Sequence, residues 1–214
     1  MSAFAPPTLD LTGSAQIGPN AVLQTLRAIR ETASPGLALE ASRAARLPDQ
    51  LPDGMIPEPW FVRLLAAVRA HVPSSETVLG RAGRYTALYV RENRVPRALR
   101  SALGLLPARA ALPVLLEAFR RHAWTFAGSG TFRVEGNYPH VLSLRDAPTC
   151  REASHPPQTG GGAYYAAAFQ ELLALAAPGV EVREIDCVAR GAPVCRFEIT
   201  LPETRARGNR CASC

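Results

Sequence analysis

Cysteine is the residue type in this chain whose spacing most clearly suggests chemistry. Cys187 and Cys195 lie within two β-prone runs, at about 180–189 and 194–201, that are joined by a short loop. Such runs predict a β-hairpin in which the two thiols lie opposite or nearly opposite each other. Two neighbouring thiolates can bind Zn²⁺, and Glu184 can add a carboxylate oxygen. Because side chains alternate along a strand, Glu184 reaches the same site only at a β-bulge or a strand end.

A tetrahedral zinc site needs a fourth ligand, and the stretch ahead of the next helical pattern offers two candidates, Cys150 and His155. The alternative is that the hairpin cysteines are small buried side chains without a metal. The spacing alone fits both interpretations. The remaining pair, Cys211 and Cys214, has no second Cys-x2-Cys motif or βαβ unit beside it. We therefore expect a flexible tail there.

The residues around the hairpin cysteines also form a longer motif. It reads Glu-x2-Cys-x3-Gly-x3-Cys-x-Phe over residues 184–197 and follows a helical segment with Tyr-Tyr at 164–165. This pattern resembles the signature of the 4-vinyl reductase domain, which is similar in fold to trafficking-complex subunits and haem nitric-oxide-binding domains. In related sensor domains the glutamate and both cysteines bind structural zinc. The resemblance therefore implies zinc on Glu184, Cys187 and Cys195.

The resemblance leaves the fourth zinc ligand to be chosen from this chain. The related sensors have a cysteine close to the helix, where this chain has Gly160-Gly-Gly162. Cys150 is therefore the predicted fourth ligand, and His155 is the alternative. The predicted metal-binding residues are Cys150, Glu184, Cys187 and Cys195.

A second block, residues 121–132, resembles the bacteriochlorophyll-biosynthesis branch of the same family, the divinyl chlorophyllide or protochlorophyllide vinyl reductases. The resemblance covers about residues 75–201. The pigment implied is a flat, apolar Mg-tetrapyrrole with a carboxylate, so it needs aromatic walls, an arginine and one axial donor. The alternative for each residue is an ordinary place in or beside the core. The predicted ligand-binding residues are Arg121, His122, Trp124, Phe126 and Tyr165, with Phe132, Arg133 and Tyr164 as further candidates.

Vinyl reduction consumes two electrons and two protons, which side chains cannot supply catalytically. The segment 128–133 breaks the G-x-G-x-x-G pattern at its last glycine, and the cysteines do not match an iron–sulfur run, so no NAD, flavin or cluster motif is found. Three hypotheses follow: a tetrapyrrole-binding accessory or carrier at the vinyl-reduction step, the vinyl reductase itself with an unseen cofactor, or a small-molecule sensor domain. The expected partners are the pigment and a separate vinyl reductase or another pigment-synthesis enzyme. The sequence is also compatible with a homodimer.

The amino-acid composition excludes further classes of functional site and of binding partner. The net charge is +6, and all 24 basic residues are arginine, which excludes a P-loop lysine or a Schiff-base lysine. The densest arginines, at 91, 94, 97 and 100, are spaced like the solvated face of a helix, so no nucleic-acid partner is expected. The chain lacks a signal-peptide pattern and any run of about 18 apolar residues. We expect a cytoplasmic protein that can lie at the surface of the photosynthetic membrane.

Hydrophobic periodicity predicts an α+β fold with N-terminal helices followed by an antiparallel sheet and a helix packed on it. The domains expected are a leader, short helices and a Pro-rich linker over 1–59, a 4-vinyl reductase-like domain over 60–201, and the tail 202–214. Trp124-Thr-Phe126 is predicted to be β-prone. Helices are predicted at about 20–34, 37–46, 60–71, 75–93, 112–123 and 163–176, and strands at about 131–134, 138–145, 180–189 and 194–201.

Overall fold

The computed structural model describes residues 15–136, 139–151 and 161–202. Within these ranges the helices are α1 (Asn20–Thr32), α2 (Pro35–Ala44), α3 (Glu58–His71), α4 (Ser75–Asn93), α5 (Arg97–Leu105), α6 (Ala108–His122), α7 (Trp124–Ala127) and α8 (Ala163–Leu173), with the short 3-10 helices η1 (Pro148–Cys150) and η2 (Val188–Arg190). The strands are β1 (Gln16–Ile17), β2 (Ile56–Pro57), β3 (Thr131–Glu135), β4 (Val141–Arg145), β5 (Glu181–Asp186) and β6 (Cys195–Thr200). None of the helices in these ranges has the length and apolar character needed to cross a membrane. The predictions for His155, Cys211 and Cys214 lie outside the described residues.

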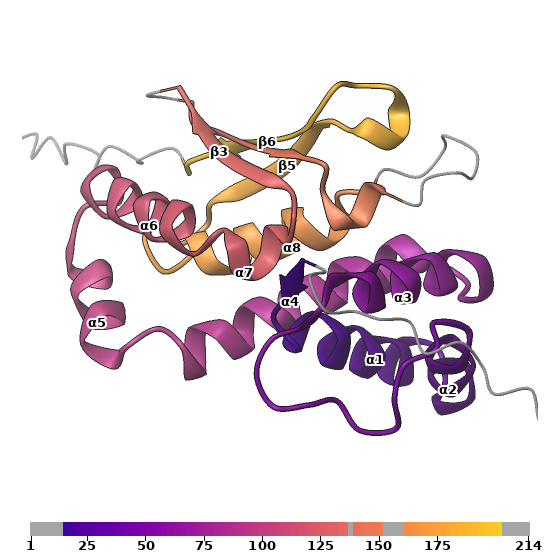
Figure 1. Cartoon of the computed structure of the whole chain (residues 1–214). Coiled ribbons are helices and arrows are strands. Elements are labelled where there is room, and N and C mark those ends of the chain that lie inside the picture. Colours follow the sequence, from indigo (N-terminus) through magenta and orange to yellow (C-terminus); the bar gives the residue numbers. More distant parts are fainter. Residues whose placement is uncertain (1–14, 137–138, 152–160, 203–214) are drawn as a thin grey trace, which may run out of the picture.

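Strands β3 to β6 form one antiparallel sheet in the order β3-β4-β6-β5, with α8 against one of its faces (Figure 1). Alternation along the strands places side chains such as Leu142 and Phe197 on the inner face, where both are fully buried. The outer face holds ion pairs, among them Arg196 with Glu135 at 3.1 Å and with Asp186 at 3.4 Å. The predicted α+β class, with helices first and an antiparallel sheet after them, is confirmed.

Helix α8 lies between the sheet and the N-terminal helices (Figure 1) and packs closely on α4. The closest approach is at Gly83, where a Cβ atom would stand 2.8 Å from the carbonyl carbon of Tyr164. One turn further along α4, Thr86 accepts a hydrogen bond of 2.9 Å from the Tyr164 hydroxyl. Glycine is needed at position 83 because no side chain fits between the two backbones. This contact holds the helical half and the sheet half together.

Residues before position 60 belong to the same core as the rest. Ile17 in β1 pairs antiparallel with Ile56 in β2, and both are buried. The backbone N–H of Glu58 donates to the carbonyl of Ala15 at 2.8 Å, which fixes the start of α3. The two segments predicted as leader and linker therefore meet in a short ribbon, and the core continues across the predicted boundary at residue 59.

Two local predictions are wrong. Trp124–Ala127 is a helical turn and not a β-prone run, because it continues from α6 through Ala123, whose carbonyl accepts from Phe126 N–H at 3.0 Å. This backbone bonding outweighs the strand preference of aromatic residues. The arginines at 91–100 do not share one helix, because Pro96 lacks an N–H and separates α4 from α5.

Candidate functional site

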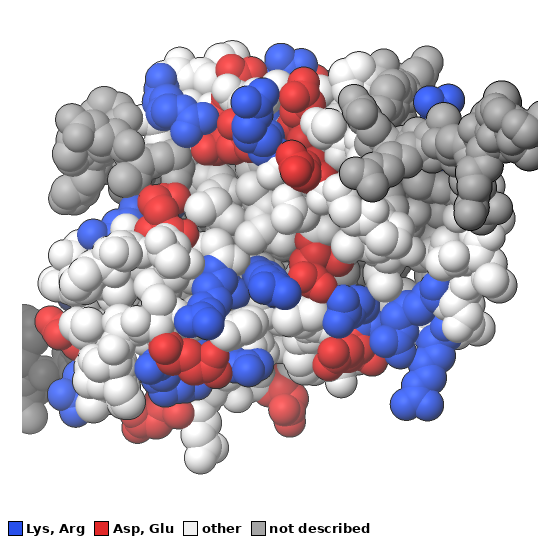
Figure 2. All heavy atoms as spheres, turned by 180° about the vertical axis from the view of Figure 1, so that it is seen from behind, with Lys and Arg blue, Asp and Glu red and all other residues white. Residues whose placement is uncertain are grey.

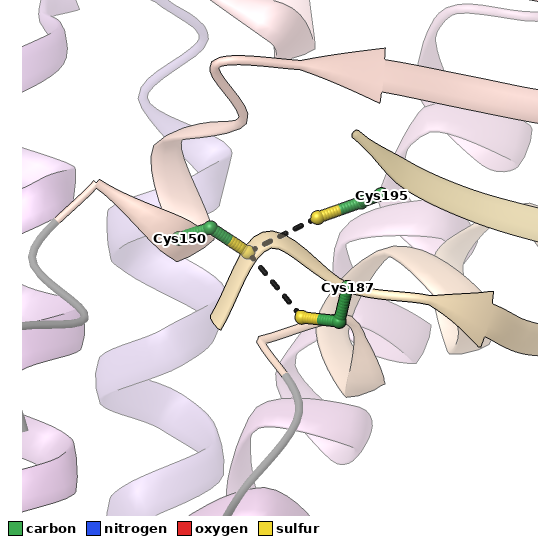
Figure 3. A group of neighbouring side chains, drawn as sticks. All are labelled: Cys150, Cys187 and Cys195. Atoms are coloured by element: carbon green, nitrogen blue, oxygen red, sulfur yellow. Dashed lines mark hydrogen bonds between the residues drawn. The ribbon is translucent and has the colours of Figure 1, made fainter. Parts of the chain in front are cut away.

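Three cysteines from separate parts of the chain converge in the interior (Figure 3). Cys150 ends η1, Cys187 follows the last residue of β5, and Cys195 is the first residue of β6. All three are buried, and their Sγ atoms lie within 4.8 Å of one another. The structure therefore brings together the three cysteines predicted as metal ligands.

The geometry of the three thiols fits a bound Zn²⁺ ion. Cys150 Sγ lies 3.8 Å from Cys187 Sγ and 3.2 Å from Cys195 Sγ. Zn–S bonds of about 2.3 Å in tetrahedral geometry place the sulfurs about 3.8 Å apart, so one distance already matches and the other needs a small opening. Both distances are far longer than a disulfide bond of about 2.05 Å. The cluster thus has the donor set and the spacing of a thiolate metal site.

Hydrogen bonds between the three thiols shift their pKa values in opposite directions. Hydrogen bonds from Cys150 and Cys195 lower the pKa of the Cys187 thiol, and the N–H of Gly161 also donates to its Sγ at 3.2 Å. The hydrogen bond to Cys187 raises the pKa of Cys150 to about 11, and the bond to Cys150 raises that of Cys195. Charge on one sulfur therefore opposes ionisation of the others. Three thiolates together need a cation between them.

Glu184 approaches the cluster from β5, as its predicted role requires. A register shift between Glu184 and Asp186 interrupts the β5–β6 pairing, which confirms the predicted bulge or strand end. The Oε2 atom pairs with Arg190 Nη1 at 3.0 Å, whereas Oε1 is buried without a hydrogen-bond partner among the described residues. Burial, followed by the charge of Cys187, raises the pKa of Glu184 to about 7. Among the described residues only the three cysteines have ligand atoms that all lie within 4.8 Å of one another, so Glu184 would have to move closer to them to become the fourth ligand.

Two glycines at the start of α8 make room for this arrangement. A Cβ atom on Gly161 would stand 2.5 Å from Cys150 Sγ and 2.9 Å from the carbonyl oxygen of Thr149. A Cβ atom on Gly162 would overlap Glu184 Oε1 and lie 2.9 Å from Phe197 Cε1. This chain therefore keeps glycines at both positions because neighbouring side chains fill the space.

Sequence reasoning missed two charged residues near the cluster. Glu76, in the first turn of α4, has a buried Oε1 without a hydrogen-bond partner in the described ranges. Burial raises the pKa of Glu76, with opposing effects from Arg69 and a smaller raising effect from Cys187. Arg190, in the hairpin connection, pairs with Glu184. No sequence signal identified Glu76, because an acidic residue in a first helical turn is common.

The aromatic residues predicted to line a pigment site lie mostly in a packed cluster. Phe126 and Phe132 have ring centroids 5.3 Å apart, and the rings of Tyr165 and Phe169 stack at 5.8 Å. Tyr165 is buried, and its hydroxyl donates to the carbonyl of Phe126 at 2.7 Å. Phe197 closes the cluster from β6 at 5.5 Å from Phe169. Rings in direct contact leave no room for a tetrapyrrole between them.

The other predicted ligand residues lie at the surface where α6 meets α7. His122 is exposed and Trp124 is 58% exposed. Arg121 is also exposed, and its Nε donates to Glu117 Oε1 at 2.8 Å. Phe126 is half-buried and connects this surface to the aromatic cluster. The structure therefore places the five predicted residues in two neighbouring environments and not around one internal cavity.

The fold has counterparts among solved structures. The Fe(II) unliganded H-NOX protein from K. algicida matches with a TM-score of 0.55 and 10% sequence identity, over 88% of this chain and 98% of that chain. An H-NOX structure from a study of heme distortion matches with a TM-score of 0.55 and 11% identity, over 90% of this chain and 100% of that chain. The predicted likeness to haem nitric-oxide-binding domains is therefore confirmed at the level of the fold.

Sequence comparison defines the family. No protein-family model matches the chain. The bacteriochlorophyll synthase 23 kDa chain of Cereibacter sphaeroides is 38% identical over 194 residues, which are 89% of this chain and 92% of the relative. The protein of the same name from Rhodobacter capsulatus is 33% identical over 200 residues, 92% of each chain. The chain therefore belongs to the family of bacteriochlorophyll synthase 23 kDa chains.

Proposed function

We propose that this chain is an accessory protein of bacteriochlorophyll synthesis that binds a divinyl Mg-tetrapyrrole and presents it for vinyl reduction by a separate enzyme. The family supports the pathway, since both relatives are named as chains of bacteriochlorophyll synthase. The fold supports the ligand class, because the H-NOX structures that share it include one described by its heme, also a flat tetrapyrrole. The resemblance of residues 184–197 to the 4-vinyl reductase signature supports the step.

The pigment surface proposed here is the junction of α6 and α7. Trp124 offers an exposed aromatic face, and His122, two residues earlier, offers an imidazole nitrogen that can bind Mg²⁺. Arg121 bonds to Glu117 through its Nε atom only, so its Nη atoms can pair with a pigment carboxylate. Tyr165 would not contact the pigment itself. Its hydroxyl donates a hydrogen bond to the Phe126 carbonyl and so helps to fix the position of α7. Part of a disc-shaped ligand would then stay open to a partner enzyme.

Zinc has a structural role in this proposal. Cys150, Cys187, Cys195 and Glu184 would hold the ion and so join η1, the end of β5 and the start of β6. Zn²⁺ has no redox chemistry, and four protein ligands would leave no open position for a substrate. The cluster would therefore pin the C-terminal hairpin to the loop before α8.

Pigment titration tests the ligand proposal. Divinyl chlorophyllide added to the purified protein should give a shifted absorption spectrum that saturates at one equivalent. His122→Ala and Trp124→Ala should each weaken binding at least about tenfold, from the loss of an axial ligand or of a large aromatic contact. His71→Ala, which changes another exposed histidine at the end of α3, is the matched control. Equal affinity in all three variants would remove the α6–α7 surface from the site.

The same mixture with NAD(P)H separates a carrier from an enzyme. Pigment binding without formation of the ethyl product supports the accessory role. Ethyl product in the absence of any other protein would show instead that the chain is the vinyl reductase with a cofactor of its own. The sensor hypothesis predicts neither turnover nor transfer of pigment to an added reductase.

Metal analysis tests the zinc site. The purified protein should contain about one zinc per chain, and Cys187→Ser and Glu184→Gln should each lower that content. Cys211→Ser changes a cysteine of the C-terminal tail and should leave the content unchanged. Zinc near zero in the unchanged protein, or equal loss in the tail variant, would contradict the proposed ligand set.

A further inference from the structure

Helix α5 lies at the edge of the molecule, at the end away from the cysteine cluster (Figure 1). Leu103 is its one buried side chain. At about 100° per residue, Ala98 and Leu105 point away from Leu103 and Ala102 points to the side, and all three are exposed. Leu105 is 87% exposed, and the next residue, Leu106, is 44% exposed. The helix thus turns an apolar face outward, where a soluble protein normally keeps polar residues.

The stretch of sequence that carries α5 contains only basic charges. From position 94 to position 116 the sequence contains four arginines, at 94, 97, 100 and 109, and no acidic residue. On α5, Arg97 lies about 80° around the helix from Leu105, whereas Arg100 lies on the side that faces away from Leu105, and Arg94 and Arg109 lie just before and just after the helix. Among the described residues none of the four forms an ion pair. Figure 2 shows basic and uncharged atoms at the right edge of the molecule, with acidic atoms beside them toward its middle.

We propose that α5 and its flanking arginines bind the surface of an anionic lipid membrane. Outward leucines would enter the boundary between headgroups and acyl chains, while the arginines contact lipid phosphates. Cations flanking an apolar helix face, with no acidic residue between them, are complementary to such a surface. The proposal is independent of pigment binding, because it uses residues outside the α6–α7 surface.

Other occupants fit the observations less well. A nucleic acid would pair with the arginines but would leave the exposed leucines without a partner. A second copy of this chain would bring two sets of unpaired arginines together across the interface, which costs free energy. An acidic protein could satisfy the charges, and the experiment below distinguishes it from lipid.

Vesicle flotation tests the proposal with the full chain. Vesicles with phosphatidylglycerol should carry the protein upward at low salt, whereas pure phosphatidylcholine vesicles should not. Two arginine substitutions together, Arg94→Gln and Arg97→Gln, should lower the partition coefficient about 25-fold, at about fivefold for each arginine. Leu105→Ser should lower it about tenfold through lost apolar burial. Raising the salt should weaken the binding of the unchanged protein.

A matched pair of substitutions on α2 is the control. Leu39→Ser and Arg43→Gln remove an exposed leucine and an exposed arginine from another face, and they should leave the partition coefficient unchanged. Circular dichroism should show that every variant is folded, because all the altered side chains lie at the surface. No binding of the unchanged protein to anionic vesicles, which is the result expected for an acidic protein partner, would overturn the proposal. So would an equal loss in the α2 control.

Discussion

Gly83→Ala should destabilise the protein more than most single substitutions. The new Cβ atom would lie 2.8 Å from the Tyr164 carbonyl carbon and 3.0 Å from its Cα, and nearer still to the carbonyl oxygen. Ordinary contact begins at about 3.4 Å, so α4 and α8 must separate by about 0.6 Å to relieve the contact with the carbonyl carbon alone, and further to relieve the contact with the oxygen. The obstacle is backbone, which cannot rotate away as a side chain can. We expect the free energy of unfolding to fall by about 3 kcal/mol or more, which is the upper end of the range for overpacking substitutions.

The control for this prediction is Gly80→Ala, three residues earlier on α4. Its Cβ atom would meet only the Ala163 carbonyl oxygen, at an ordinary 3.9 Å, so the gain in helix propensity should stabilise the protein by about 0.5–1 kcal/mol. Guanidinium denaturation at fixed zinc concentration measures both values. The melting temperature of Gly83→Ala should fall by about 6–12 °C. A loss below about 1 kcal/mol, or equal losses in both variants, would refute the close-approach argument.

Three further predictions concern buried and paired carboxylates. Gly162→Ala should displace the flexible Glu184 side chain and weaken zinc binding at least about tenfold, to the level of Glu184→Gln, in a chelator competition assay. Glu58→Ala should cost about 2–3 kcal/mol in denaturant unfolding, because Glu58 is 2% exposed and pairs with Arg151 at 3.1 Å. Hydrogen bonds hold the pKa of Glu135 below its usual 4.5, so its contribution to stability is present above pH 4.5 and is lost as the pH falls through the lower folded value. The stability difference between wild type and Glu135→Gln should therefore shrink in unfolding curves taken below pH 4.5.

Sequence patterns predicted much of this fold because the main elements have local causes. The helix over 75–93 is found with the predicted bounds, since it begins after Pro73 and Ser74 and its apolar residues recur at helical spacing. The need for a bulge near Glu184 followed from side-chain parity alone, and the register shift is where it was required. Strands β1 and β2 were missed, because two-residue strands leave no periodic signal.

The pigment-binding residues show the limit of that reasoning. Residue type suggested aromatic walls, but type does not say whether a ring faces a ligand or another ring. Phe126 and Tyr165 face other rings, because both contact Phe169 of α8 and each also contacts a ring of the sheet, Phe132 for Phe126 and Phe197 for Tyr165. Trp124 stays exposed only because α7 turns it outward, and the helical state of that segment was not predicted. Both outcomes depend on contacts between elements far apart in the chain.

Charge explains how a carboxylate can complete a cluster of three thiolates. Three thiolates around Zn²⁺ leave one net negative charge, and Glu184 adds a second. Arg190 would offset this second charge, because its Nη1 pairs with Oε2 and leaves Oε1 unpaired among the described residues. Backbone N–H groups of Gly161 and Val188 donate to two of the sulfurs at 3.2 and 3.4 Å. Arg190→Gln should therefore weaken zinc binding about tenfold without removing a ligand, whereas Arg183→Gln, an exposed arginine on the sheet's outer face, should not. Equal zinc affinity in these two variants would show that the carboxylate does not need its arginine.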